Sequence, residues 1–193
     1  MKAAALLEIL TVAEKLKCNT RHSFTSSGRH ESVAEHSWRI ALMALLMEDE
    51  FPEINIDKVI RMCIIHDLGE AFTGDIPAFE KKDEHRVKED EVFLNWVDSF
   101  PEPYGKEFKE LIIEMRELKS NESKLFKALD NLEAVIQHNE ADISTWLPLE
   151  YDLQFTYGAD KVAFSPYLKQ LKEEIDKVTR EKINTSLRTV KNE

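Results

Sequence analysis

Residues 64–77 read IIHDLGEAFTGDIP, and this stretch holds the groups that constrain the fold most. An apolar segment runs directly into His66 and Asp67, and two more carboxylates, Glu70 and Asp75, follow within eight positions. Desolvating a charge costs several kcal/mol unless the charge is paired or bound to a metal. If the helix continues for one more turn, His66, Asp67 and Glu70 share one face. We therefore expect a cation beside this helix end.

Helical patterns continue on both sides of this stretch. Ser32 followed by Glu35 is a capping-box pattern, so we expect a helix from here to about residue 49. His36 falls in its first turn. Asp57 is the expected cap of the next helix, whose apolar residues cover nearly its whole circumference, as is typical of a buried central helix. Further helices are predicted over residues 6–16, 87–97, 108–118 and 165–185, and from near residue 122.

Two segments lack helical periodicity. Residues 20–31 read TRHSFTSSGRHE, and their richness in Ser, Thr and Gly predicts a loop. Residues 143–164 are aromatic and irregular, and they receive no assignment.

The composition favours an all-α protein. The 193 residues include only six prolines and five glycines, which is typical of packed helices. A chain of this length supports one substantial core. We therefore expect a single helical-bundle domain over residues 1–193, with its motif core at about 30–140 and the C-terminal helix packed on it.

Charge and cysteine usage limit the classes of partner and compartment. The formal net charge of −11 argues against a nucleic-acid partner, because phosphate backbones require a basic face. Cys18 and Cys63 cannot form a disulfide framework, which suits a reducing cytosol. Neither a signal peptide nor a membrane span is recognisable. A cytoplasmic protein without a membrane partner is expected.

One part of this acidic chain is basic. Residues 15–30, here called the basic segment, contain no Asp or Glu, and their cationic side chains are Lys15, Lys17, Arg21 and Arg29 with His22 and His30. The composition alone leaves open whether this is a solvated loop or a binding surface.

Two distant residues complete a candidate metal site. His36 lies at a helix start, and Asp130 stands between leucines in an amphipathic helix. Together with His66 and Asp67 they would form a mixed nitrogen and oxygen site suited to Mn, Fe, Co, Ni or Zn. Taken singly, His36 is more often a capping or surface residue, and Asp130 more often lies on a polar face. The remaining histidines, His22, His30, His85 and His138, are expected at the surface.

The order of these motifs resembles a known family. The segments VAEHS, IIHDLGEAFTGDIP and ALDNLEA follow one another in this chain. Their motif residues have the order H…HD…D, which resembles the motif of the HD-domain metal-dependent phosphohydrolases. The HDLGE and TGDIP elements resemble, more narrowly, the branch that contains the 5′-deoxynucleotidases. The resemblance covers about residues 6–139 and implies a single HD-domain helical bundle.

The resemblance also implies roles for individual residues. It places the metal ligands at His36, His66, Asp67 and Asp130. Glu70 and Asp75 would position water or bind the sugar, and in some members such acids hold a second ion such as Mg. The phosphate-binding arginine matches Arg21, with Arg29 as the second candidate.

The activity implied is hydrolysis of deoxynucleoside 5′-monophosphates to deoxynucleoside and phosphate by a cytoplasmic homodimer. An alternative with the same site is an HD-type hydrolase of nucleoside triphosphates or guanosine tetraphosphate. A second alternative is a non-catalytic, metal-stabilised nucleotide-binding module. The two acids Glu70 and Asp75 favour an enzyme, because a structural site has no use for them.

Overall fold

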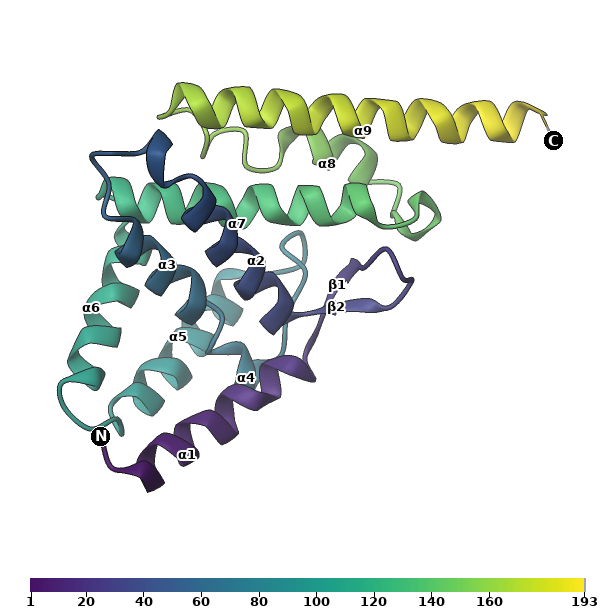
Figure 1. Cartoon of the computed structure of the whole chain (residues 1–193). Coiled ribbons are helices and arrows are strands. Elements are labelled where there is room, and N and C mark those ends of the chain that lie inside the picture. Colours follow the sequence, from purple (N-terminus) through teal and green to yellow (C-terminus); the bar gives the residue numbers. More distant parts are fainter. Residues whose placement is uncertain (193) are drawn as a thin grey trace. The chain divides into compact units, whose positions relative to one another are not determined.

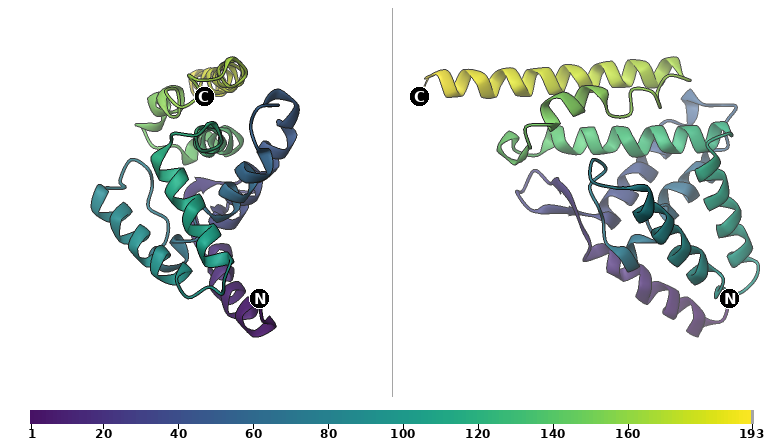
Figure 2. Two further views of the ribbon diagram at one scale, coloured as in Figure 1. Left: turned by 90° about the vertical axis from the view of Figure 1, so that its left-hand side faces the viewer. Right: turned by 180° about the vertical axis from the view of Figure 1, so that it is seen from behind.

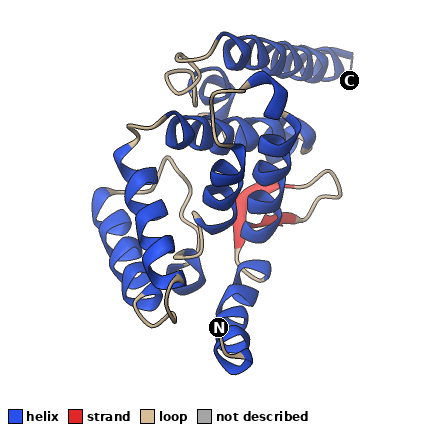
Figure 3. Ribbon diagram, turned by 60° about the vertical axis from the view of Figure 1, so that its left-hand side comes forward, coloured by secondary structure: helices blue, strands red, loops and turns tan. Residues whose placement is uncertain are grey.

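The computed structural model describes residues 1–192, with the side chains of all of these except Arg86 and residues 189–192. Helices dominate, as the composition predicts, and Figure 3 shows a single small two-stranded sheet among the described residues. The all-α prediction is confirmed. The main helices are α1 (Ala3–Ala13), α2 (Val33–Leu46), α3 (Ile56–Ile65), α4 (Glu70–Thr73), α5 (Asp83–Val97), α6 (Tyr104–Glu117), α7 (Asn121–Glu140), α8 (Glu150–Thr156) and α9 (Pro166–Asn192).

The chain divides into two compact units. The first comprises residues 1–22 and 31–126, and the second comprises residues 23–30 and the described residues from 127 onward. The α7 helix begins in the first unit and continues in the second. The single-domain organisation stays a prediction.

In the first unit, α2 and α3 pack side by side (Figures 1 and 2). The α3 helix buries Val59, Met62 and Cys63 completely. Ile64, however, is 54% exposed, so the prediction that α3 is buried all round is wrong. The helix is amphipathic, and only one stripe of its apolar residues faces the core. The last buried residue of that stripe, Ile65, also ends the helix.

The predicted capping box of α2 is confirmed. Ser32 Oγ accepts a hydrogen bond from the Glu35 amide at 3.2 Å, and the Glu35 carboxylate accepts one from the Ser32 amide at 2.9 Å. The predicted cap of α3 is wrong. Asn55 caps this helix by accepting a hydrogen bond from the Lys58 amide at 3.1 Å, and Asp57 lies two positions later in the first turn, where an acid also favours a helix start.

The predicted loop over residues 20–31 is a β-hairpin. Its strands are β1 (Thr20–Phe24) and β2 (His30–Ser32), and the Thr25 amide donates to the Arg29 carbonyl at 2.7 Å where they meet. Short strands with a polar tip lack the apolar alternation that would reveal them in sequence.

In the second unit, α9 runs beside α7 and α8 (Figure 1). The Asn139 amide on α7 donates to the Thr179 hydroxyl on α9 at 2.9 Å. The buried Lys172 ammonium donates to the Gln154 and Phe155 carbonyls at the end of α8. The unassigned segment 143–164 thus contains a short 3₁₀ helix (Ile143–Thr145) and α8, which α9 covers.

Candidate metal centre

His36 is fully buried in the first turn of α2. The capping box at Ser32 and Glu35 fixes where this helix begins, and therefore which side of it His36 occupies. Its ring centroid lies 5.4 Å from that of His66, at the end of the neighbouring helix α3. The two histidines that the sequence places thirty positions apart are therefore neighbours.

A backbone hydrogen bond fixes the orientation of His66. Its Nδ1 lies 2.9 Å from the Cys63 carbonyl, and because a carbonyl only accepts, Nδ1 carries the hydrogen. The other ring nitrogen, Nε2, lies 2.9 Å from Asp67 Oδ2. Such an Nδ1 contact is the usual way in which a protein presents the opposite nitrogen to a metal.

The α-helix α3 ends at Ile65. The prediction that His66, Asp67 and Glu70 share one face assumed one more α-helical turn, and this assumption is wrong. The amides of Leu68 and Glu70 instead donate to the carbonyls three positions back, Ile65 and Asp67, as in a 3₁₀ turn. Side chains at i and i+3 line up in such a turn, so Asp67 and Glu70 face the same way. Asp67 therefore belongs to two clusters, one with the histidines and one with Glu70.

The donor atoms of the first cluster fit a divalent ion. The ligand atoms of His36, His66 and Asp67 lie within 4.8 Å of one another. Ligands at about 2.0–2.2 Å from a transition metal lie about 3–4.4 Å apart, so only small movements would bring these atoms to one ion. Two imidazoles and a carboxylate are also the donor types that such metals select.

The second cluster joins Asp67 and Glu70 to Glu89 of α5, again with ligand atoms within 4.8 Å. Burial, and then the charges of Asp67 and Asp75, raises the pKa of Glu70 to about 10. Glu70 Oε1 lies 3.4 Å from the Lys81 ammonium. Its Oε2 is buried and, among the described residues, accepts no hydrogen bond. A buried carboxyl group with one oxygen that accepts no hydrogen bond is suited to bind a proton or a cationic ligand.

Asp75 also faces this region. Gly74 has φ +75°, a conformation that favours glycine, and it turns the chain after α4. Burial raises the pKa of Asp75, whereas the nearby charge of Arg21 lowers it. The direction of this side chain, which helical periodicity cannot predict beyond a glycine, therefore brings it within electrostatic reach of the arginine.

The guanidinium group of Arg21, in the basic segment, lies close to two carboxylates. Its Nε lies 3.2 Å from Oε2 of Glu31, a buried residue, and its Nη1 lies 3.8 Å from Asp67 Oδ2. A permanent cation thus lies beside a predicted metal ligand. The guanidinium group is planar and matches the oxygens of a phosphate well.

Two candidate residues belong to the second unit. Arg29 lies at the exposed hairpin tip, where its Nη1 donates to the His30 carbonyl at 3.1 Å. Asp130 lies on α7, where its Oδ2 is 2.7 Å from the Lys127 ammonium. The roles of Arg29 in phosphate binding and of Asp130 as a metal ligand stay predictions.

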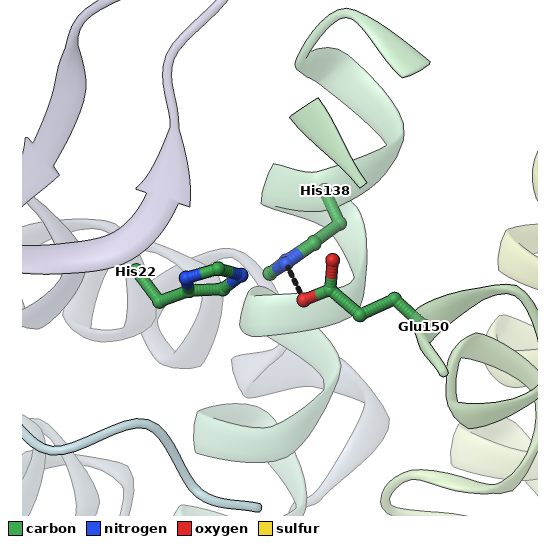
Figure 4. A group of neighbouring side chains, drawn as sticks. All are labelled: His22, His138 and Glu150. Carbon is green, nitrogen blue, oxygen red and sulfur yellow. Dashed lines mark hydrogen bonds and ion pairs between the residues drawn. The ribbon is translucent and has the colours of Figure 1, made fainter. Parts of the chain in front are cut away.

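Of the four histidines expected at the surface, only His30 is exposed, whereas His22, His85 and His138 are partly buried. His138 Nε2 lies 2.8 Å from Oε1 of the buried Glu150, the interaction drawn in Figure 4. The other oxygen of Glu150 accepts from the Leu147 amide, and the Trp146 indole donates to the His138 carbonyl. These contacts fasten the segment between α7 and α8 to α7.

Sequence patterns missed three residues of the first unit that touch the candidate site, namely Glu31, Lys81 and Glu89. Glu89 carries a usable signal, because it precedes the buried Phe93 and Val97 by one and two helical turns and so lies on the inward face of α5. Glu31 and Lys81 have no such sequence signal, since they lie outside any periodic segment.

These features define a helical protein with a cluster of histidines and carboxylates suited to a metal ion. The chain belongs to the HD domain family, whose model matches residues 13–172. Membership implies a divalent metal, in keeping with the cluster of His36, His66 and Asp67. Among the described residues, no helix is both long enough and apolar enough to cross a membrane.

Named relatives resemble most of the chain. The human protein named 5′-deoxynucleotidase HDDC2 is 34% identical over 143 residues, which cover 72% of this chain and 69% of the relative. Its mouse counterpart is 33% identical over 179 residues, which cover 90% and 87%. The crystal structure of a protein described as a predicted metal-dependent phosphohydrolase, from Magnetospirillum magnetotacticum MS-1, matches with a TM-score of 0.76 at 26% identity over 92% of each chain.

Proposed function

We propose that this chain is a metal-dependent phosphohydrolase that converts deoxynucleoside 5′-monophosphates to deoxynucleoside and phosphate. The observation that carries this proposal is the convergence of His36, His66 and Asp67, whose ligand atoms lie within 4.8 Å of one another. The relatives named 5′-deoxynucleotidase support the substrate class. A phosphoric monoester hydrolase needs a cationic centre and groups that donate or accept a proton, and the site contains candidates for both.

The proposed ligands are His36, His66, Asp67 and Asp130, and the proposed ion is Mn, Co, Fe, Ni or Zn. The mixed nitrogen and oxygen donors suit these ions. When bound, such an ion activates water for attack and polarises a phosphoryl oxygen. Glu70 and Asp75 are the proposed acids for a second ion such as Mg, which prefers oxygen ligands.

The side chains of the protein perform the remaining steps. Arg21, with Arg29 as the second candidate, binds and neutralises the phosphate dianion. Glu70 orients the attacking water, since its carboxyl group lies in one cluster with Asp67 and has a buried oxygen without a hydrogen-bond partner among the described residues. Asp75 binds a sugar hydroxyl or assists the leaving oxygen. Because Arg21, Glu70 and Asp75 lie around one small region of the first unit, they can hold a monophosphate in a single orientation.

A phosphate-release assay tests the proposal. The protein is stripped of metal with a chelator, reloaded with Mn, Co or Mg, and given the four deoxynucleoside 5′-monophosphates, their ribose counterparts and the corresponding triphosphates. We expect release from the deoxynucleoside monophosphates only in the reloaded protein. Release from triphosphates alone would indicate the HD-type triphosphate hydrolase instead. Tight nucleotide binding with no release from any substrate would indicate the non-catalytic module.

We propose further that the enzyme works as a cytoplasmic homodimer, as the family resemblance implies. Light scattering coupled to size-exclusion chromatography tests the oligomeric state. A mass near twice 22.4 kDa is expected, and a monomer at all concentrations would refute it.

A further inference from the structure

The ammonium group of Lys81 lies among carboxylates that the proposed chemistry uses. Lys81 is in the segment between α4 and α5, and its Nζ lies 2.6 Å from Glu89 Oε2 and 3.4 Å from Glu70 Oε1. Glu70 and Glu89 form one cluster with Asp67. Three acids so close together repel one another unless a cation is present. Lys81 supplies that cation from the chain itself.

The fold builds this arrangement through a glycine of the HDLGE motif. A Cβ atom on Gly69 would lie 3.1 Å from Glu89 Cγ and 3.3 Å from Phe93 Cβ, which is closer than side chains normally pack. The absence of a side chain at this position lets α5 approach closely the turn that carries Asp67 and Glu70. Phe93 and Val97 anchor the same face of α5 in the core. Glu89 is therefore held at a fixed distance from the turn.

Glu70 depends on Lys81 for its orientation. Among the described residues, Lys81 is the hydrogen-bond donor to the Glu70 side chain, and it contacts Oε1 alone. A carboxylate held through one oxygen presents the other in a defined direction. Glu89 in turn holds the long, flexible Lys81 side chain, whose ammonium would otherwise be free to rotate away.

We propose that Lys81, held by Glu89, is a positioning residue for Glu70 and sets the direction in which Oε2 faces the attacking water. This inference rests on the proposed function, in which Glu70 is the group that orients that water. Lys81 is not a phosphate ligand in this arrangement, because its ammonium is engaged by two carboxylates. Its effect on the reaction passes through Glu70.

Steady-state kinetics on a deoxynucleoside monophosphate test this inference. Lys81→Met should lower kcat about ten- to a hundredfold, as the loss of a residue that orients a site group typically does, while KM and metal content stay unchanged. Lys81→Arg, which keeps the charge, should restore most of the rate. Glu89→Gln, which frees Lys81 without removing it, should lower kcat by a smaller factor. The matched controls are Lys88→Met and Glu91→Gln, exposed positions on α5 that should retain the full rate.

A double variant separates positioning from a general loss of structure. If Lys81 acts through Glu70, then Lys81→Met combined with Glu70→Gln should be no slower than Glu70→Gln alone. If the rate losses of Lys81→Met and Glu70→Gln multiply in the double variant, the inference is overturned. A raised KM at unchanged kcat, or a loss of bound metal, in Lys81→Met would also overturn it. Melting curves identify the variants that fold. If Lys81→Met does not fold, the kinetics of Glu89→Gln test the inference instead. An inactive wild type refutes the proposed function, whereas an active wild type with an equally active Lys81→Met refutes only this inference.

Discussion

His66 shows how one backbone contact prepares a side chain for chemistry. The Cys63 carbonyl accepts the Nδ1 hydrogen, so the ring is oriented before any ligand binds. Nε2 is then directed toward Asp67, and the neighbouring His36 ring lies within 5.4 Å. Preorganisation of this kind lowers the entropy that metal binding would otherwise cost.

Asp67 is the residue on which both clusters of the first unit depend. Asp67→Asn removes the negative charge and one oxygen ligand while it preserves the side-chain shape. We expect the variant to lose its bound metal and its phosphohydrolase activity, measured by elemental analysis and by phosphate release. Asp57→Asn, an exposed position on α3, is the matched control and should keep both. A metal-free but fully active Asp67→Asn protein would contradict the proposed mechanism.

Arg21 is expected to act on the substrate rather than on the metal. Charge-assisted hydrogen bonds contribute about 1.5–3 kcal/mol, so Arg21→Ala should raise KM for a deoxynucleoside monophosphate by about tenfold or more. Metal content should be unchanged. Arg61→Ala, at an exposed arginine of α3, is the control. Metal loss in Arg21→Ala would show instead that its contact with Asp67 holds the ligand in place.

At the scale of the element, local capping signals locate the start of α2 correctly and misplace the cap of α3 by two positions. The Ser32 and Glu35 box predicts the start of α2, and the helix predicted from residue 165 begins at Pro166 as α9. They performed poorly where the backbone departs from an α-helix. The 3₁₀ turn after Ile65 keeps near-helical dihedral angles, so no residue type distinguishes it from a continued helix.

The cap of α2 can be measured directly. Ser32→Ala removes the side-chain acceptor for the Glu35 amide and should lower the free energy of unfolding by about 1 kcal/mol. For a protein of this size the melting temperature should fall by about 2–4 °C. Ser26→Ala, at the exposed hairpin tip, is the control and should melt like the wild type. An unchanged melting temperature in Ser32→Ala would mean that tertiary contacts alone fix the start of α2.

On the scale of the whole molecule, the proposed function requires an acidic protein to bind an anion. The net charge of −11 repels a phosphate ester, and Arg21 together with a bound divalent ion would reverse that sign locally. The HD family model spans residues 13–172, which include parts of both units. The single functional domain stays a prediction.

Metal removal should destabilise the entire protein. A ligand that binds only the folded state at a hundred times its Kd contributes about 2.7 kcal/mol. Treatment with a chelator should therefore lower the melting temperature by about 5–10 °C, and added Mn or Co should restore it. Calorimetry with and without the ion measures the shift. Identical melting curves in both conditions would count against a buried metal centre.

Local patterns are sufficient to predict the helical class, the cap of α2 and the motif residues His36, His66 and Asp67, because periodicity and capping act between neighbours in the chain. Local patterns do not reveal the contacts of Lys81 with Glu70 and Glu89, the ion pair of Glu31 with Arg21, or the exposed side of α3. Those contacts depend on which helix faces meet. That choice is made by close packing, such as the approach of α5 to Gly69, and not by any local pattern.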